Sequence, residues 1–275
     1  MTIEKIHQIL IFLENNYHRQ INPSELEDIS NYSYRNIQRI FNSILKETIG
    51  NFCVRLKLEK AYKQLVYTDV PVIQIAYDVG YESNQSFAKA FKNKFLITPL
   101  QARQNKANLF EEYIKQKKDT SFSIDFEYVY KEKVNVYYKT VISNNYNNVA
   151  INALWDAVHD ENESVYPYDC FGVIVDQPII SDQTKSRYEA CISDSSNPKR
   201  YLSKTIFGGW YAKYIHLGCY DEIEETYRKI YYRWLYENNY ELNTSPIIEH
   251  YIADRNSATE LVTAIYVPVK RKLSK

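Results

Sequence analysis

The chain is 275 residues long, and its 34 Lys and Arg balance 34 Asp and Glu, so the formal net charge is zero. This balance argues against a uniformly basic nucleic-acid coat, and 45% hydrophobic residues argue against a disordered chain. No run of about 18 apolar residues occurs, so we expect no membrane-spanning helix. The cysteines are scattered without a C-x-x-C pair, which predicts neither a metal site nor disulfides and favours a cytoplasmic protein.

The zero total is the sum of two halves with opposite charge. Residues 1–106 hold 14 Lys and Arg against 10 Asp and Glu, a net of +4, so the remaining 20 and 24 give residues 107–275 a net of −4. A polar, charged stretch separates the halves. We therefore predict a first domain over 1–106, a linker over 107–125 and a second domain over 126–275.

The first half has the apolar spacing of helices throughout. Its first helix carries a single apolar stripe, made of Ile3, Ile6, Ile9, Leu10 and Leu13. The segment 22–25 predicts a helix start, with Asn22 as N-cap, proline at the first position and Glu25 at the third. Ser33 is expected to cap the next helix, and a longer helix is expected over 52–66.

This plan of a short helix, a tight turn and a capped helix occurs twice. Residues 26–42 align with 76–92 at an offset of 50 without a gap. The aligned pairs are Ile29 with Val79, Ser33 with Ser83, Ile37 with Phe87 and Phe41 with Phe91. The pattern predicts an all-α domain with two helix-turn-helix motifs joined by a linker helix.

The second helix of each pair has a polar face opposite its apolar face. The polar face of the first copy consists of Arg35, Gln38, Arg39 and Asn42, and that of the second of Asn84, Gln85, Lys89 and Lys92. Arg and Lys pair with guanine edges or phosphates, and Gln and Asn pair with adenine edges. Either face alone could be an ordinary solvated helix face, but two faces in this context favour contact with double-stranded DNA.

Several segments of the first half resemble the DNA-binding domain of the AraC/XylS family of bacterial transcription regulators. They are 75–81 (IAYDVGY), 86–87, 91–92 and 98–103 (TPLQAR) in the second copy, and 36–41 (NIQRIF) with Leu58 and Ala61 in the first. The resemblance implies that the two recognition helices enter successive major grooves. Lys46 and Leu96 stand where the family usually has glycine and Lys57 where it favours arginine, which leaves the angle between those helices open.

The second half alternates between strand and helix patterns. We predict strands over 134–143, 170–176, 187–193, 210–217, 247–252 and 261–267, and helices over 150–159 and 220–238. The order repeats at an offset of about 73 to 79 residues, which predicts an α+β domain of two βαββ units. A groove between two such units is a common place for a small ligand.

Residues 128–269 resemble the GyrI-like effector-binding domain. The whole chain resembles the Rob-type arrangement, in which an AraC-type DNA-binding domain is followed by a GyrI-like domain. The matching segments are 187–189 (RYE), 209–212 (GWYA), 218–220 (GCY), 232–235 (YRWL), 246–251 (PIIEHY) and 261–268. The resemblance implies that Glu249 faces a ligand pocket. Candidate pocket walls are Trp155, Tyr188, Trp210, Trp234 and Tyr251.

A buried carboxylate among aromatic rings favours a lipophilic cation, through Coulomb and cation–π attraction. The alternatives are a salt bridge from Glu249 to a nearby Arg or Lys, and an ordinary core position for each aromatic ring. The leading hypothesis is a DNA-binding regulator whose second domain binds a small effector, with no cofactor and with RNA polymerase as a candidate partner. A second domain that only docks protein partners, and a GyrI-like hydrolase, remain as alternatives. The histidines show no metal spacing and no G-x-S-x-G motif occurs, so we expect no enzyme.

Overall fold

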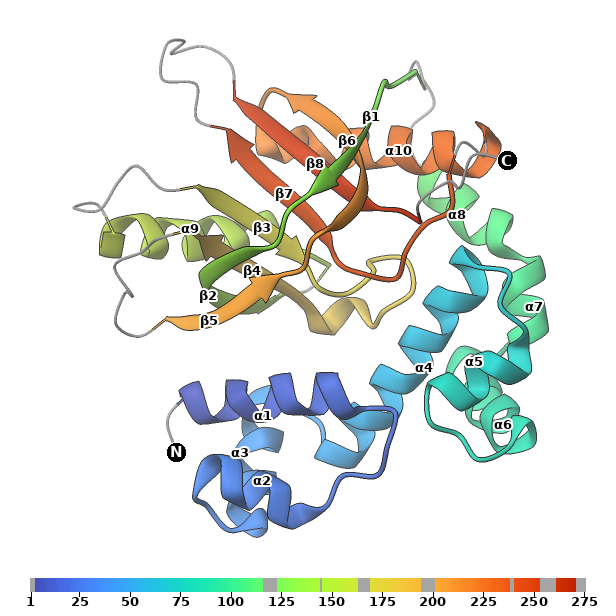
Figure 1. Cartoon of the computed structure of the whole chain (residues 1–275), viewed down its shortest axis with the longest axis vertical. Helices are drawn as coiled ribbons and strands as arrows, with labels where there is room; N and C mark the ends of the chain where they lie inside the picture. Colours follow the sequence, from blue (N-terminus) through green and yellow to red (C-terminus); the bar gives the residue numbers. More distant parts are fainter. Residues whose placement is uncertain are drawn as a thin grey trace. The chain divides into compact units, whose positions relative to one another are not determined.

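The computed structural model describes residues 3–115, 123–143, 145–162, 169–193, 201–237, 240–252 and 261–270 (Figure 1). The chain divides into two compact units, Met1–Asn105 and Lys106–Lys275. The first is helical and the second is built on a sheet, so the expected two-domain architecture is confirmed at this level. Within these ranges every helix is too short or too polar to cross a membrane.

The first unit contains helices α1–α7. Their bounds are α1 Ile3–Asn16, α2 Pro23–Ser30, α3 Tyr34–Leu45, α4 Ile49–Tyr67, α5 Val72–Asp78, α6 Asn84–Phe95 and α7 Pro99–Gln104. The Asn22 side chain caps α2 and Glu25 completes a capping box, as the sequence predicts. The Thr48 side chain caps α4, and the Thr98 side chain caps α7 in a second capping box, which fixes where each helix begins.

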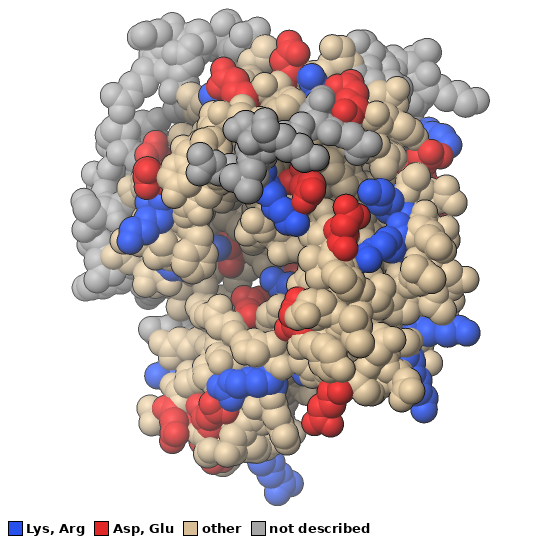
Figure 2. Space-filling view, turned by 45° about the vertical axis from the view of Figure 1, so that its right-hand side comes forward, with Lys and Arg blue, Asp and Glu red and all other residues tan. Residues whose placement is uncertain are grey.

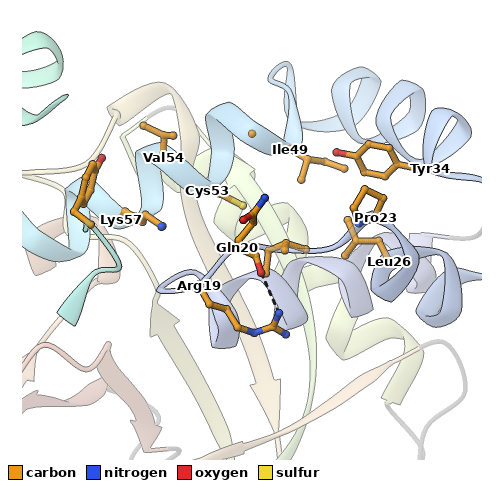
Figure 3. A pocket seen from close by; sticks show the side chains of 12 residues that line it. Arg19, Gln20, Pro23, Leu26, Tyr34, Ile49, Cys53, Val54 and Lys57 are labelled. Atoms are coloured by element: carbon orange, nitrogen blue, oxygen red, sulfur yellow. Dashed lines mark hydrogen bonds between the residues drawn. The ribbon is translucent and has the colours of Figure 1, made fainter. Parts of the chain in front are cut away.

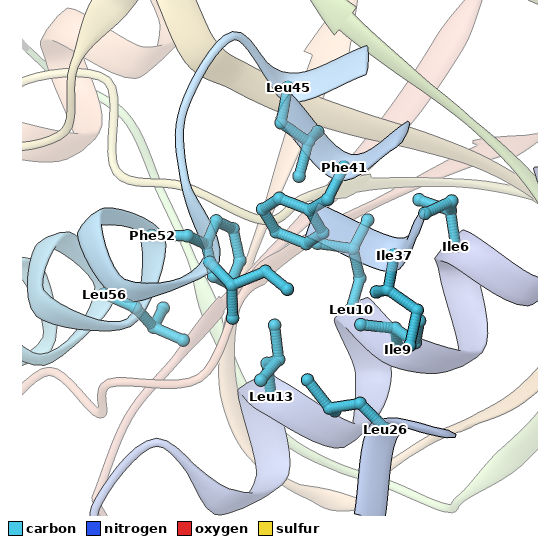
Figure 4. Packing of buried hydrophobic residues seen from close by; sticks show 11 residues of the cluster. Ile6, Ile9, Leu10, Leu13, Leu26, Ile37, Phe41, Leu45, Phe52 and Leu56 are labelled. Atoms are coloured by element: carbon cyan, nitrogen blue, oxygen red, sulfur yellow. The ribbon is translucent and has the colours of Figure 1, made fainter. Parts of the chain in front are cut away.

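A hydrophobic cluster packs α1–α3 against the first half of α4 (Figure 4). Its members share near-complete burial and are Ile6, Ile9, Leu10, Leu13, Leu26, Ile37, Phe41, Leu45, Ile49, Phe52 and Leu56. Burial of each such side chain contributes about 1.5–3 kcal/mol. This cluster positions α3, because Ile37 and Phe41 are both fully buried in it.

A ladder of aromatic rings packs α6 against the second half of α4. Tyr62 of α4 contacts Phe91 and Phe95, and Phe91 contacts Phe87 and Phe95, all with centroid separations between 4.7 and 5.6 Å. Phe87 and Phe91 are fully buried. The helix α4 therefore carries α3 on one half and α6 on the other.

In its described residues, the second unit contains an eight-stranded sheet and the helices α8, α9 and α10. Their bounds are α8 Lys106–Ile114, β1 Glu127–Lys131, β2 Val134–Ser143, α9 Asn148–Asn162, β3 Cys170–Ile174, β4 Ser186–Ile192, β5 Leu202–Ile206, β6 Gly209–Leu217, α10 Ile223–Glu237, β7 Ile247–Ile252 and β8 Val262–Pro268. Short 3₁₀ turns lie at Gln183–Lys185 and Tyr220–Glu222. The strand order is β1-β6-β8-β7-β3-β4-β2-β5, and every neighbouring pair is antiparallel.

The two strands that the sequence did not predict are those at the edges, β1 and β5. β1 contains no buried residue and β5 contains one, Ile206, because an edge strand is covered on fewer sides. β1 pairs with β6, and β5 pairs with β2. At the middle of the sheet β3 pairs with β7.

The segment 107–125, expected to be a linker, begins with a helix. In α8, Phe110 is fully buried and its ring contacts Tyr231 and Trp234 of α10. Phe110 and Ile114 are four residues apart, so both fall on one helix face. The apolar pair at this spacing was the signal for a helix, and the charged residues around it obscured that signal.

Candidate DNA interface and effector site

The turn between α2 and α3 fixes the start of α3, the helix that the sequence predicts to be the first recognition helix. Asn31 ends α2 in the left-handed conformation, with φ of 60°. The Glu27 carboxylate then accepts a 2.6 Å hydrogen bond from the backbone N–H of Tyr34, the first residue of α3. A carboxylate at a helix N-terminus satisfies a free N–H and is favoured by the helix dipole. α2 thereby holds the N-terminus of α3.

The polar face of α3 is exposed as the sequence predicts. The side chains of Arg35, Gln38, Arg39 and Asn42 are all exposed, whereas Ile37 and Phe41 are buried. Arg39 donates a 3.0 Å hydrogen bond to the Asn36 side chain, which orients the guanidinium along the helix surface.

The turn between α5 and α6 depends on Gly80. Its φ is +82°, and a Cβ added there would lie 1.7 Å from the backbone oxygen of His18, so only glycine fits. Ser83 then caps α6 by accepting a hydrogen bond from the N–H of Ser86.

The polar face of α6 is exposed as well, and it consists of Asn84, Gln85, Lys89 and Lys92. On the face drawn in Figure 2, basic and acidic side chains are interspersed and form no large patch of one sign.

The second candidate site is built around Glu249 on β7. The side chain is fully buried and accepts hydrogen bonds from three tyrosine hydroxyls. Tyr227 donates to Oε1 at 2.7 Å, and Tyr251 and Tyr220 donate to Oε2 at 2.7 and 3.0 Å. In the part of the chain that the structure describes, no Lys, Arg or His side chain forms an ion pair with this carboxylate.

The network continues from Tyr251 toward helix α9. The hydroxyls of Tyr251 and Tyr188 lie 2.5 Å apart, and the indole N–H of Trp155 donates to the Tyr188 hydroxyl at 3.0 Å. The Trp155 ring also meets the Tyr251 ring edge-on at 5.3 Å. Tyr188 is fully buried, whereas Trp155 and Tyr251 are half-buried and form the more accessible side of the cluster.

Strand β3 leaves the space that this cluster fills. Gly172 lies directly opposite Glu249 in the β3–β7 pair. A Cβ at Gly172 would lie 2.2 Å from the Tyr188 hydroxyl, 2.8 Å from the Tyr251 hydroxyl and 2.9 Å from Oε2 of Glu249. The cluster therefore forms where β7, β3, β4, α9 and the start of α10 come together.

Burial governs the protonation of these groups. Burial raises the pKa of the Glu249 carboxyl above its ordinary value, and the three tyrosine hydrogen bonds oppose that rise. Burial and then the nearby Glu249 charge raise the pKa of Tyr251, Tyr220 and Tyr227 well above the usual range. The tyrosines therefore stay protonated and serve as donors.

The structure brings four of the six predicted effector residues together: Glu249, Tyr251, Tyr188 and Trp155. It places the other two elsewhere. Trp234 packs on Phe110 of α8 as part of the core, and Trp210 meets Tyr130 of the edge strand β1. A large ring alone does not tell a core position from a pocket wall, which explains both placements.

Three further residues of the cluster were not predicted from the sequence: Tyr220, Tyr227 and Gly172. Tyr220 and Tyr227 are seven residues apart, a spacing that repeats on one helix face, and this was the signal that could have found them. Gly172 becomes significant only once β3 and β7 are known to be neighbours. Among the described residues, no group of three or more His, Cys, Asp or Glu could hold a metal ion.

Comparison with known proteins shows two matching family models. A helix-turn-helix domain model matches residues 26–105, and the GyrI-like small molecule binding domain matches residues 122–270, more than half of the chain. Among solved structures, the EcmrR C-terminal domain is 20% identical with a TM-score of 0.43, over 54% of this chain and 98% of that one. An AraC-type regulator from Chromobacterium violaceum is 24% identical with a TM-score of 0.36, over 38% and 93%.

The similar curated proteins are transcription regulators. RhaS of Mannheimia succiniciproducens is 36% identical over 102 residues, which are 37% of this chain and 38% of RhaS. SoxS of Escherichia coli K12 is 32% identical over 100 residues, which are 36% of this chain and 94% of SoxS. The chain therefore belongs to the AraC/XylS family of DNA-binding transcription regulators and carries a GyrI-like small molecule binding domain.

Proposed function

We propose that this regulator reads promoter DNA with two recognition helices, α3 and α6, and that a lipophilic cation bound beside Glu249 modulates it. The observation that carries the effector part is a fully buried carboxylate held by three tyrosine hydroxyls, with no ion pair in the described part of the chain.

The DNA part of the proposal rests on α3 and α6 as the second helices of two helix-turn-helix motifs. The proposed contacts are Arg35, Gln38 and Arg39 on α3, and Asn84, Gln85, Lys89 and Lys92 on α6. Each is exposed, and none is a carboxylate that phosphate would repel. Two such helices would enter major grooves about one helical turn apart, roughly 34 Å.

The test of the DNA part is titration of a labelled duplex selected by the native protein from a random-sequence library. We expect the double variant Arg39→Ala, Lys89→Ala to bind at least about 30-fold more weakly, because each of the two lost contacts contributes about 1–3 kcal/mol. The matched control is Lys106→Ala with Lys115→Ala, which removes two exposed cations outside α3 and α6. Equal affinity of the two double variants would reject the assignment.

For the second domain, we propose that β2-α9-β3-β4 and β6-α10-β7-β8 are two copies of one unit. Support comes from the starts of corresponding elements: 134 and 209, 148 and 223, 170 and 247, and 186 and 262. The edge strands at 127 and 202 follow the same offset. The β3–β7 pair would then lie on the internal two-fold axis, which places Glu249 between the copies.

The chemistry around Glu249 favours a cation with an apolar body. A buried carboxylate is costly, and three neutral hydroxyl donors offset only part of that cost. A cation that reaches it along the half-buried rings of Trp155 and Tyr251 gains Coulomb and cation–π attraction together. A ligand anion at the same place would be repelled.

The test of the effector part is calorimetric titration with cations from benzyltrimethylammonium to tetraphenylphosphonium, and with tetraphenylborate as an anion of matched shape. We expect cations to bind and Glu249→Gln to weaken them at least about tenfold, since about 1.4 kcal/mol is lost with the charge. Glu189→Gln is the matched control, because that carboxylate already pairs with Lys204. Equal binding of the borate, or no effect of Glu249→Gln, would reject the cation.

A further inference from the structure

The DNA-binding unit contains a cavity that no part of the proposed function uses (Figure 3). Its volume is about 280 Å³, the space of roughly nine liquid water molecules. Leu26 of α2, Tyr34 of α3 and the α4 residues Ile49, Cys53 and Lys57 line it. Its walls come from α2, α3, α4, the loop before α2 and Tyr81 in the turn before α6.

The charges at this cavity are all positive. Arg19 and Lys57 line it, and none of its twelve lining residues is Asp or Glu. Arg19 is already paired with Glu25 at 2.7 Å. Lys57 donates to the Gly80 carbonyl at 3.1 Å and lies 5.7 Å from the centre of the Tyr81 ring.

The ammonium of Lys57 is therefore the group that can take a ligand. An ammonium has three N–H donors, and the Gly80 carbonyl uses one. Lys57 is half-buried, and burial lowers its pKa, so an anion nearby would stabilise its charged form.

We infer that this cavity binds a small amphipathic carboxylate, with an apolar chain or ring of about ten non-hydrogen atoms against its aliphatic walls and the carboxylate on Lys57. A DNA phosphate carries the same charge but lacks the apolar body that Leu26, Ile49 and Val54 would cover. A ligand there touches elements of both helix pairs, because Tyr34 precedes Arg35 and Tyr81 precedes α6.

The half-buried free thiol of Cys53 provides a local readout. In a Cys219→Ser background, which removes the exposed cysteine, iodoacetamide labelling of Cys53 is followed by mass spectrometry. We expect sodium decanoate, below its micellar range, to slow labelling saturably by about tenfold, and decanol and decyltrimethylammonium to slow it far less. Lys57→Met should abolish the protection, and Lys57→Arg should keep it.

Two controls separate this site from its rivals. Lys60→Met removes a neighbouring cation of α4 that does not line the cavity, and it should leave the protection by decanoate unchanged. Glu249→Gln should also leave it unchanged, which separates this site from the effector site. Absent protection, equal protection by decanol, or protection only by a DNA duplex would each overturn the inference.

Discussion

Glu249 is the ionisable group at the centre of the proposed effector site, so its charge state would control which ligands that site accepts. Its pKa in the folded protein is raised by burial, so ionisation costs stability as the pH rises through that pKa. A cation beside the carboxylate lowers the pKa again, since opposite charges favour the ionised form. Binding of a cation should therefore release a proton.

This linkage predicts that affinity for a cation that does not titrate, such as tetraphenylphosphonium, increases with pH. Below the raised pKa of Glu249 the affinity should rise by up to about tenfold per pH unit, and above it the affinity should level off. Calorimetric titration in two buffers with different ionisation enthalpies measures both the affinity and the released proton. Glu249→Gln should give a flat profile, and a profile with the same slope in that variant would assign the proton to another group.

Gly172 makes the Glu249 cluster possible, and its replacement predicts a large local effect. Gly172→Ala places a Cβ 2.2 Å from the Tyr188 hydroxyl, so the hydroxyl network must shift. We expect a loss of about 1–3 kcal/mol in the free energy of unfolding, the cost of disturbing buried hydrogen bonds. Urea unfolding measures it. Gly209→Ala is the control in another strand, because its nearest new contact would be 3.8 Å away; a similar loss there would mean that strand glycines in general matter.

The sequence predicted the polar core of this site only in part, for a physical reason. Alternation along one strand places Glu249 and Tyr251 on the same face, so the pair was predictable. Gly172 and Tyr188 join it through strand neighbours that are far apart in the chain. Such pairing depends on the whole sheet, so the sequence alone did not identify Gly172.

At the scale of single elements, the proposed recognition helices α3 and α6 each end at a residue in a backbone conformation that this residue type disfavours. Lys46 ends α3 with φ of 55° and Leu96 ends α6 with φ of 62°, in the left-handed region. The sequence predicted that these non-glycine residues would affect the geometry. In the structure both residues adopt the left-handed conformation that ends a helix, although this conformation is strained for a residue with a Cβ.

Leu96→Gly should therefore stabilise the protein by about 0.5–1 kcal/mol, because glycine adopts a left-handed φ without strain. Little apolar burial is lost, since Leu96 is 83% exposed. Thermal unfolding measures the change. The control is Leu100→Gly, an exposed leucine within α7, where glycine should destabilise by about 0.5–1 kcal/mol. Destabilisation by both variants would show that the Leu96 side chain contributes more than its cap costs.

At the scale of the whole molecule, the net charge of zero separates into +4 over residues 1–106 and −4 over 107–275. The total charge therefore does not predict DNA binding, and the positions of the individual cations are more informative. The salt dependence of binding follows the number of phosphates that the protein neutralises, since each contact releases condensed counterions. Two variants that change the net charge equally should then differ in the salt dependence of their DNA affinity if only one of them removes a phosphate contact.

Lys92→Ala and Lys115→Ala each remove one positive charge from an exposed side chain. Lys92 lies on the polar face of α6, so its loss should lower the slope of log affinity against log salt by about 1 and weaken binding to every sequence alike. Lys115 follows α8 and pairs with Glu111, so its loss should leave the slope unchanged. Fluorescence anisotropy between about 50 and 200 mM salt resolves this difference. Equal slopes in both variants would mean that total charge, and not the face of α6, controls the electrostatics of binding.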